Sequence, residues 1–137
     1  MKNNLCFVDT VCWIALLNRK ERFHEKTDKM YKNLMKSGYY LLTTSAVLDE
    51  TANALSDPLF KPAVIKLFQK IEKSSRVEIT FVDDVLWSKG WELYRSRLDK
   101  GWSLTDCISF EVMRESNIRE ALTRDHHFEQ AGYKILL

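Results

Sequence analysis

Three acidic residues lie where a short apolar run ends or a helix begins, positions that suit chemistry on a bound ligand, and a fourth acid lies within a helix. Asp9 and Asp125 each follow an apolar run typical of a buried strand. Asp106 lies at the start of an expected helix, and Glu50 lies within one. In an open parallel sheet, ligands bind beyond the carboxyl ends of the strands. Carboxylates that meet at this edge would form an oxygen-only cluster suited to Mg²⁺ or Mn²⁺.

Each of these acids also has an ordinary structural interpretation. Asp9 and Asp125 stand where Asp is a favoured helix N-cap, and for Asp9 position alone leaves cap and ligand as equal alternatives. Asp106 follows Ser103 by three residues, the spacing of a capping box. Glu50 lies on the rim of the apolar face of its helix, where most glutamates are simply solvated. Spacing does not favour Glu50 over its neighbour Asp49.

Short strands and helices alternate along the whole chain. Apolar and β-branched runs predict strands at residues 5–8, 39–42, 76–82, 121–123 and 134–137. Helical periodicity with capping and stop residues predicts helices at residues 11–17, 23–36, 45–55, 62–72, 83–100 and 102–115, and one helical turn at 125–130. Such alternation indicates an α/β fold in which helices cover both faces of a central parallel sheet.

The composition narrows the class of protein. With 137 residues, 45% of them apolar, and only four Gly and two Pro, we expect one globular domain over residues 1–137. The three cysteines lie in apolar stretches without paired spacing, which favours buried thiols over a zinc or redox site. Short apolar runs and the lack of a leader pattern predict a cytoplasmic protein without a membrane span. A net charge of +2 means that nucleic acid would need a local basic patch.

The chain resembles a PIN domain, and it is most similar to the VapC-like bacterial ribonucleases. The resemblance extends over nearly all of the chain, and residues 102–132 are its most specific part. It is carried by the segments Phe-Val-Asp-Thr at 7–10, Leu-Asp-Glu at 48–50, Ser-Leu-Thr-Asp-Cys-Ile-Ser-Phe at 103–110 and Leu-Thr-Arg-Asp-His-His-Phe at 122–128.

This resemblance implies a three-layer α/β/α PIN-like fold and a metal-dependent endoribonuclease that uses Mg²⁺ or Mn²⁺. The acidic quartet of the family falls on Asp9, Glu50, Asp106 and Asp125. Thr10 and Thr123 match polar positions beside the first and last acids, where they would orient carboxylates or a metal-bound water. The chain departs from many relatives at Val11, where they carry a small polar residue after the Asp-Thr pair.

The resemblance also implies partners. These are an RNA substrate, a small antitoxin whose C-terminal segment lies over the acidic cleft, and a second copy of the chain. For the homodimer, apolar surface is expected on the helices within residues 23–36 and 45–72. Seven basic residues are candidates for phosphate contacts near the cleft: Arg19, Lys20, Arg22, Lys26, Lys29, Arg119 and Arg124.

Aromatic residues and histidines offer further candidates. Trp102 and Trp13 are candidates for stacking on bases. Trp87 and Trp91, four residues apart on one helix face, are instead expected to pack in a core or an interface. The adjacent pair at 126–127 cannot both enter one site, because consecutive residues of a helical turn point about 100° apart. We expect surface or packing roles for both histidines.

Other functions place acids at strand ends as well. A receiver-like phosphoacceptor domain needs an acidic pair at the first strand and a late lysine, but this chain has a lone Asp9 and Thr123-Arg124. A haloacid-dehalogenase-type phosphatase needs a second acid two residues after the first, where Val11 stands. A housekeeping RNA-processing nuclease and a non-catalytic PIN-like binding module remain as alternatives to a toxin.

Overall fold

A five-stranded, wholly parallel sheet forms the centre of the computed structural model, which describes residues 4–137. The strands lie in the order β3-β2-β1-β4-β5, so β1 is flanked by β2 and β4. Residues that follow β1 and β4 therefore leave the sheet side by side. The strand bounds are β1 Leu5–Val8, β2 Tyr40–Thr44, β3 Val77–Thr80, β4 Glu120–Leu122 and β5 Lys134–Ile135.

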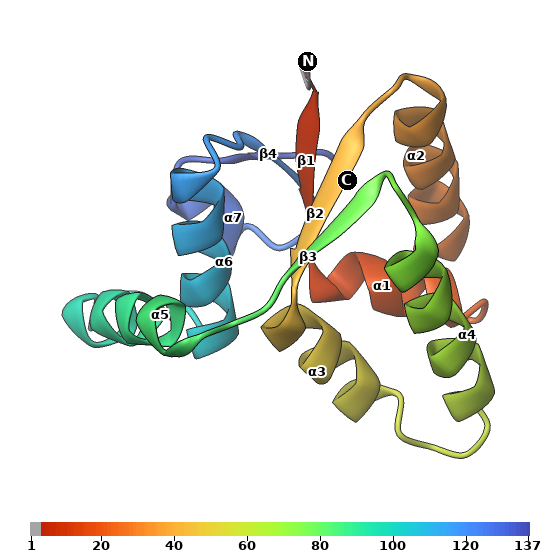
Figure 1. Cartoon of the computed structure of the whole chain (residues 1–137), viewed down its shortest axis with the longest axis horizontal. Coiled ribbons are helices and arrows are strands. Elements are labelled where there is room, and N and C mark those ends of the chain that lie inside the picture. The colour runs from red at the N-terminus through yellow and green to blue at the C-terminus, as the bar shows by residue number, and fades with distance from the viewer. Residues whose placement is uncertain (1–3) are drawn as a thin grey trace.

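Helices cover both faces of this sheet, as expected. On one side lie α1, α2 and α4, on the other α5, α6 and α7, and α3 continues from the end of β2 (Figure 1). The longest helices have 13 residues. Within residues 4–137, none is long and apolar enough to cross a lipid bilayer. The bounds are α1 Thr10–Leu17, α2 His24–Lys36, α3 Ser45–Ala54, α4 Lys61–Lys73, α5 Asp84–Ser96, α6 Leu104–Glu115 and α7 His127–Gln130.

An aromatic cluster fixes α6 and α7 against the middle of the sheet. The Phe128 ring lies 6.2 Å from that of Phe7 in β1 and 4.9 Å from that of Phe110 in α6. All three side chains are buried, and burial of each is worth about 2 kcal/mol. The three cysteines are buried free thiols, as predicted. This packing fixes the first turns of α6 and α7 beside the end of β1.

Several element boundaries differ from the prediction, among them those of β2 and α5. Strand β2 continues through Thr44, whose hydroxyl accepts the α3 capping bond from the backbone N–H of Val47. The predicted helix begins at Ser45, but the hydroxyl of this residue accepts from the backbone N–H of Val82 rather than capping the helix. Helix α5 ends at Ser96 rather than near residue 100, because the chain turns over residues 97–103 to begin α6.

Candidate active site

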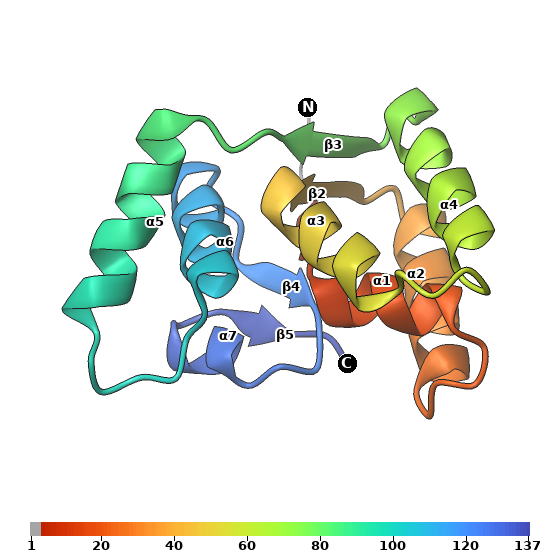
Figure 2. The same ribbon diagram turned by 90° about the horizontal axis from the view of Figure 1, so that it is seen from below.

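Three of the four predicted acids meet at the carboxyl edge of the sheet. Asp9 directly follows β1, and Asp125 comes three residues after the end of the neighbouring strand β4. Asp106 lies in the first turn of α6. The segments that carry them lie next to one another where β1 leads into α1 and β4 leads into α7 (Figure 2). The sheet order thus brings together residues that are far apart in the sequence.

Asp9 is buried and held by a hydrogen bond from a side chain. It is 3% exposed, and its Oδ2 accepts a 2.9 Å hydrogen bond from the hydroxyl of Thr123. Although Asp9 stands at the N-cap position of α1, its side chain makes no capping bond. Burial raises the pKa of Asp9 to about 7, and the nearby carboxylates of Asp106 and Asp125 also raise it. The geometry therefore favours the ligand interpretation over the cap.

Asp106 completes the capping box of α6, whose N-cap is Ser103, and faces the site with the same carboxylate. The Ser103 hydroxyl accepts from the backbone N–H of Asp106 at 3.0 Å, and Asp106 Oδ2 accepts from the backbone N–H of Ser103 at 3.1 Å. Both bonds of the predicted capping box are present. Burial raises the pKa of Asp106, and the charge of Asp125 adds to this effect. The two interpretations of Asp106 are therefore compatible, because the capping box fixes the carboxylate.

Asp125 is connected to Asp9 through a single hydroxyl. Thr123 Oγ1, which donates to Asp9, accepts from the backbone N–H of Asp125 at 3.0 Å. Asp125 Oδ1 in turn accepts a 2.9 Å bond from the backbone N–H of His127. This hydrogen bond fixes the direction of the backbone from Asp125 to His127, where α7 begins.

His127 is a site residue that the sequence interpretation placed elsewhere. Its Nδ1 lies 3.2 Å from Asp106 Oδ2 and 3.3 Å from Asp125 Oδ1. The expectation of a surface or packing role is thus wrong for His127, whereas His126 is exposed. The Asp-x-His spacing could have indicated this position. An Asp side chain often accepts a hydrogen bond from the backbone N–H two residues later, and this bond brings that residue close to the carboxylate.

These donor atoms fit a divalent cation. Within residues 4–137, the donor atoms of Asp106, Asp125 and His127 all lie within 4.8 Å of one another. Two of the three are carboxylate oxygens, the ligands that hard divalent cations take. Like charges at this distance repel one another, and a bound cation relieves the repulsion.

Thr10, beside Asp9, has a buried hydroxyl with no protein hydrogen-bond partner in the described part of the chain. Buried polar groups normally have a partner, so a water held at the acids would fit here. The predicted role of Thr10 in orienting such a water stays a prediction.

Glu50, the fourth predicted acid, lies apart from the donor cluster. It is exposed on α3 and lines a cavity of about 500 Å³ together with Asp49, Trp87 and Thr105. Thr105 directly precedes Asp106, so this cavity borders the first turn of α6. The structure places Asp49 and Glu50 on the same cavity and does not choose between them.

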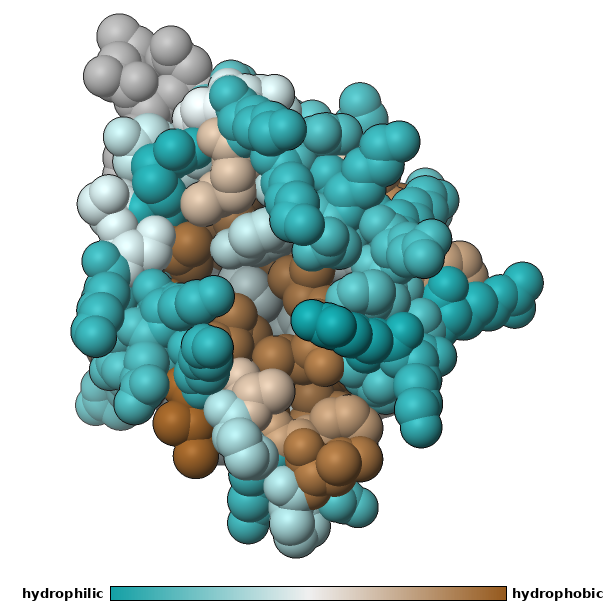
Figure 3. Space-filling model, turned by 90° about the vertical axis from the view of Figure 1, so that its right-hand side faces the viewer, coloured by the Kyte–Doolittle hydropathy of each residue, from teal (hydrophilic) through white to brown (hydrophobic). Residues whose placement is uncertain are grey.

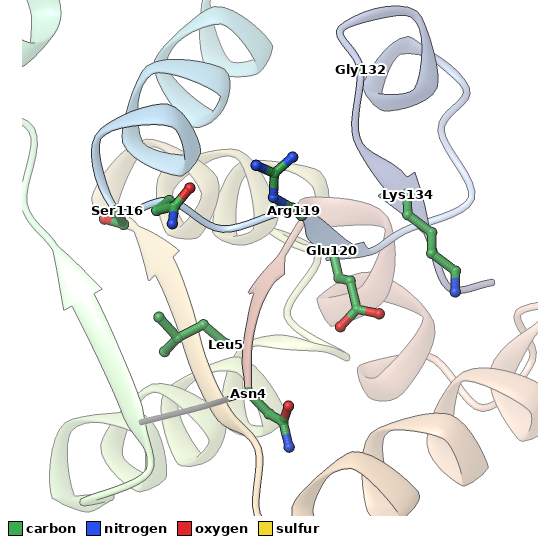
Figure 4. A pocket seen from close by; sticks show the side chains of 8 residues that line it. Asn4, Leu5, Ser116, Arg119, Glu120, Gly132 and Lys134 are labelled. Carbon is green, nitrogen blue, oxygen red and sulfur yellow. The ribbon is translucent and has the colours of Figure 1, made fainter. Parts of the chain in front are cut away.

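A cavity of about 740 Å³ lies at the opposite edge of the sheet, where the strands begin. It is lined by Asn4, Arg119, Glu120 and Lys134, among others (Figure 4). Arg119 precedes β4 and Asp125 follows it. The prediction that Arg119 contacts RNA near the acids is therefore wrong, because a whole strand separates the two.

Two of the predicted base-stacking residues are inside the protein. Trp13 is fully buried, and its Nε1 donates to the hydroxyl of Thr43. Trp102 is 7% exposed, and its Nε1 donates to Gln130 Oε1. Both rings belong to the core, so neither offers a free face to a base.

Positive charge borders the acids on the α1 side. Arg124 lies between Thr123 and Asp125, with its guanidinium carbon 3.5 Å from the ring centre of Phe23. One of its nitrogens lies 3.9 Å from Glu21 Oε1. These contacts place the loop of residues 18–23, which contains three of the predicted RNA-binding residues, beside the site.

Comparison with known proteins assigns the chain to a protein family. The profile of the PIN domain matches residues 6–133. The chain belongs to the PIN domain family. This PIN domain is 28% identical over 129 residues to the 23S rRNA-specific endonuclease VapC20 of Mycobacterium tuberculosis, across 94% of this chain and 95% of the relative.

Solved structures share the fold of this PIN domain. The crystal structure of M. tuberculosis VapC20, described as a sarcin-ricin loop cleaving toxin, matches with a TM-score of 0.81 and 30% identity. That match covers 95% of this chain and 96% of VapC20. VapBC2 of Rickettsia felis, bound to promoter DNA, matches with a TM-score of 0.68 and 18% identity over 96% of this chain and 97% of that chain. FitAcB of Neisseria gonorrhoeae matches with a TM-score of 0.60 and 15% identity over 97% and 96%.

Proposed function

We propose that this PIN domain is a metal-dependent endoribonuclease that hydrolyses phosphodiester bonds of RNA as the toxin of a toxin-antitoxin pair. The observation that carries the proposal is the convergence of Asp9, Asp106 and Asp125 at the carboxyl edge of the sheet. The rRNA endonuclease activity named for VapC20, the relative that matches almost the whole chain, supports the same reaction class.

The three aspartates, with Glu50 from the neighbouring cavity, would hold Mg²⁺ or Mn²⁺. Such a cation, when bound, supplies an acidified water and neutralises charge on the phosphate oxygens. The protein contributes fixed geometry: Thr123 holds Asp9, and the capping box holds Asp106. Asp106 or Asp125 is the better candidate to accept a proton, because Asp9 is the most buried of the three.

RNA is the substrate that the surroundings of the acids support. Arg124 and the adjoining loop of residues 18–23 bring cationic side chains next to a carboxylate cluster that would itself repel phosphate. Phosphate contacts of this kind position a nucleic acid without reading its sequence. We assign a structured RNA of the translation apparatus, rRNA or tRNA, as the substrate class. Activity on such RNA implies a cytoplasmic location.

An antitoxin has a suitable docking groove on the opposite side from α5. A cavity of about 350 Å³ between α2 and α4 has Leu16, Tyr31, Leu67 and Ile71 in its lining, with Lys32 and Lys70 among the polar residues. Figure 3 faces this side and shows an apolar band between hydrophilic ridges. Asp28 also lines the groove and pairs with Lys32, so the groove suits a mainly apolar segment. The C-terminal segment of such an antitoxin would lie over the acids and place a basic side chain among them.

We also propose a homodimer, formed through α5 and the loop before it. In the region where dimer surface was predicted, Ile65 and Leu59 are exposed. A larger apolar set lies on and next to α5, at the outside of the molecule (Figure 2), and comprises Phe81, Val85, Trp87, Trp91, Tyr94 and Leu98. These residues are between 42% and 92% exposed, and a stable interface buries about 800 Å² per partner.

The stacking within α5 favours a protein partner over RNA bases on this face. The Trp87 and Trp91 rings stack with centres 5.8 Å apart, and the Trp91 and Tyr94 rings with centres 5.5 Å apart. Since the three rings stack on one another along the helix, part of their face area is already covered. Such a surface packs against a second copy of itself in an isologous interface.

A cleavage assay tests the proposed function. Purified protein is incubated with labelled rRNA and tRNA fragments in Mg²⁺, Mn²⁺ or chelator, beside folded Asp9→Asn and Asp125→Asn variants. We expect metal-dependent cleavage that both variants lose. If folded wild-type protein free of any co-purified inhibitor cuts nothing and binds no cation, the chain is instead a PIN-like binding module. Cleavage that survives in both variants would contradict the site assignment.

A further inference from the structure

His127 brings a nitrogen donor to a site made otherwise of carboxylates in the described part of the chain, and what it contributes rests on the proposed metal-dependent function. Its Nδ1 lies 3.2 Å from Asp106 Oδ2 and 3.3 Å from Asp125 Oδ1. Two ligands at right angles on an ion with bonds of about 2.1 Å lie about 3 Å apart. The imidazole nitrogen and the two carboxylate oxygens are therefore spaced like ligands of one cation.

We propose that His127 is a nitrogen ligand of the catalytic cation, so that the centre is a mixed nitrogen and carboxylate site. A nitrogen that served only to hold one acid would point at that acid. Nδ1 instead faces two carboxylates at nearly equal distance, and an imidazole has one Nδ1 proton to give. A cation placed between these three atoms satisfies all of them at once.

The surroundings hold the imidazole in this direction. The backbone N–H of His127 donates to Asp125 Oδ1 at 2.9 Å, which fixes the main chain beside the ligand it faces. On the far side of the ring, a Cβ at Gly101 would lie 3.9 Å from Nε2, in ordinary contact. The loop before α6 therefore stands behind the imidazole. His127 is partly buried, with 27% of its side chain exposed.

The nitrogen ligand has a consequence for the choice of metal. Mg²⁺ prefers an all-oxygen, largely hydrated environment, whereas Mn²⁺ and the later divalent metals accept imidazole more readily. His127 therefore favours Mn²⁺ over Mg²⁺ at this site. Replacing the imidazole should remove this preference and leave the carboxylates to bind both ions.

Electron paramagnetic resonance of bound Mn²⁺ tests the proposal without RNA. The metal-free protein is titrated with MnCl₂. The electron spin echo modulation of the bound Mn²⁺ is recorded to detect nitrogen coupling, and the affinity for Mg²⁺ is obtained from its competition with Mn²⁺. The variants are His127→Ala and His127→Asn, which keeps an N–H donor near the Nδ1 position. His126→Ala is the matched control, since this neighbouring histidine is exposed.

We expect directly coordinated nitrogen in the wild type and in His126→Ala, and its loss in both His127 variants. Mn²⁺ affinity should fall about tenfold or more in His127→Ala, a loss typical for a metal-site residue, while Mg²⁺ affinity changes less than about threefold. A wild-type spectrum without nitrogen coupling overturns the proposal, whatever the variants do. Equal weakening of both ions also overturns it, because a residue that merely positions carboxylates would act on both.

The outcomes also separate this proposal from the proposed function. If wild-type protein binds Mn²⁺ without nitrogen coupling and Asp106→Asn abolishes binding, the carboxylate metal centre stands and His127 is not its ligand. If the wild type binds neither ion, the metal-dependent function and the role of His127 are both wrong.

Discussion

At the scale of single residues, the buried carboxylate of Asp9 lowers the stability of the metal-free protein when it is ionised. Asp9 is buried among other acids, with Thr123 as its hydrogen-bond partner from another side chain. Its ionised form is therefore costly until a cation arrives. The proposed divalent cation would supply the opposite charge that this buried carboxylate lacks in the metal-free protein.

Stability of the metal-free protein should fall as pH rises. The folded-state pKa of Asp9 is raised to about 7, above the unfolded value near 3.8, so the folded state holds more protons between these values. The contribution of Asp9 to the free energy of unfolding is therefore fully present below about pH 4. It decreases as the pH rises to about 7, by at most about 4 kcal/mol in total. Urea unfolding of metal-free protein at pH 5 and pH 8 measures this difference.

The control for this effect is Asp9→Asn, which removes the titrating group and keeps an oxygen for the Thr123 hydroxyl. We expect the metal-free variant to be more stable than wild type at pH 8 and to show a smaller loss between pH 5 and pH 8. Adding Mn²⁺ should stabilise only the wild type. An unchanged pH slope in the variant would show that Asp9 does not cause it.

Neither sequence nor structure decides whether Glu50 or Asp49 is the fourth acid of the site, so substitutions of the two residues are compared. The acidic quartet implied by the family includes Glu50, and both residues line the same cavity beside α6. We predict that Glu50→Gln lowers metal-dependent cleavage by about 10² or more, whereas Asp49→Asn stays within about threefold of wild type. The reverse pattern in rates on one RNA would transfer the role to Asp49.

Single residues also show what the sequence could predict. The positions of Asp9, Asp106 and Asp125 follow from strand ends and a capping signal, because local pattern places them at one edge. The role of His127 depends on a turn that redirects the backbone and on a contact with α6, 21 residues away. The burial of Trp13 and Trp102 likewise depends on packing between elements, which periodicity does not specify.

At the scale of elements, α6 connects stability to catalysis through its N-terminal box. Ser103→Ala removes the hydroxyl that accepts from the backbone of Asp106, and loss of such a cap costs about 1 kcal/mol. We predict this loss together with a drop in cleavage of about tenfold, because Asp106 is no longer fixed. Thermal unfolding and cleavage rates are both measured.

The matched control is Asp83→Ala, which removes the side-chain cap of α5, a 2.8 Å bond to the backbone N–H of Leu86. It should cost similar stability and leave the cleavage rate of the folded protein unchanged. If Ser103→Ala keeps full activity, the capping box does not position Asp106 for the reaction.

The contact between α5 and α6 depends on a glycine. A Cβ at Gly90 would lie 2.4 Å from the Cγ1 of Ile108 and 3.3 Å from its backbone. Gly90→Ala should therefore destabilise the protein by about 1–3 kcal/mol, although Ala is the better helix former. The exposed Ser88→Ala on the same helix is the control and should be neutral or slightly stabilising. A stabilised Gly90→Ala in chemical unfolding would contradict this close packing.

Element boundaries were predictable where a cap or stop residue marks them. Asp83 caps α5 and Ser103 caps α6, as the sequence indicates. The end of α5 was predicted too far along, because the chain already turns over residues 97–103, where Arg97 pairs with Asp99. The α3 cap moved by one residue because sheet pairing extends β2 through Thr44.

At the scale of the whole molecule, the parallel order of the sheet explains both the site and the surface. Placing β1 between β2 and β4 brings together acids from the start, the end and the last third of the chain. The helices that follow cover the sheet, and α5 is left with an apolar outer face. The three-layer fold was predictable from alternation, but this exposed face was not, because the helical period cannot say what covers a helix.

Association through α5 should be sensitive to charge on that face. Trp91→Glu places a carboxylate in the middle of the aromatic stack and should convert a dimer into a monomer in light scattering. Ile65→Glu, on the helix within the region first expected to form the interface, should leave the dimer intact. Dimer loss in Ile65→Glu but not in Trp91→Glu would assign the interface to α4 instead.

The most direct measurement for the metal centre is the cleavage rate of Asp106→Asn on one defined RNA in saturating Mn²⁺. The substitution keeps an oxygen that can accept the capping bond from Ser103, so the fold should be retained. We predict that the cleavage rate falls about 10³-fold, while the free energy of unfolding stays within about 1 kcal/mol of the wild-type value. A folded Asp106→Asn that cleaves at the wild-type rate would contradict the assignment of this acidic edge as the catalytic site.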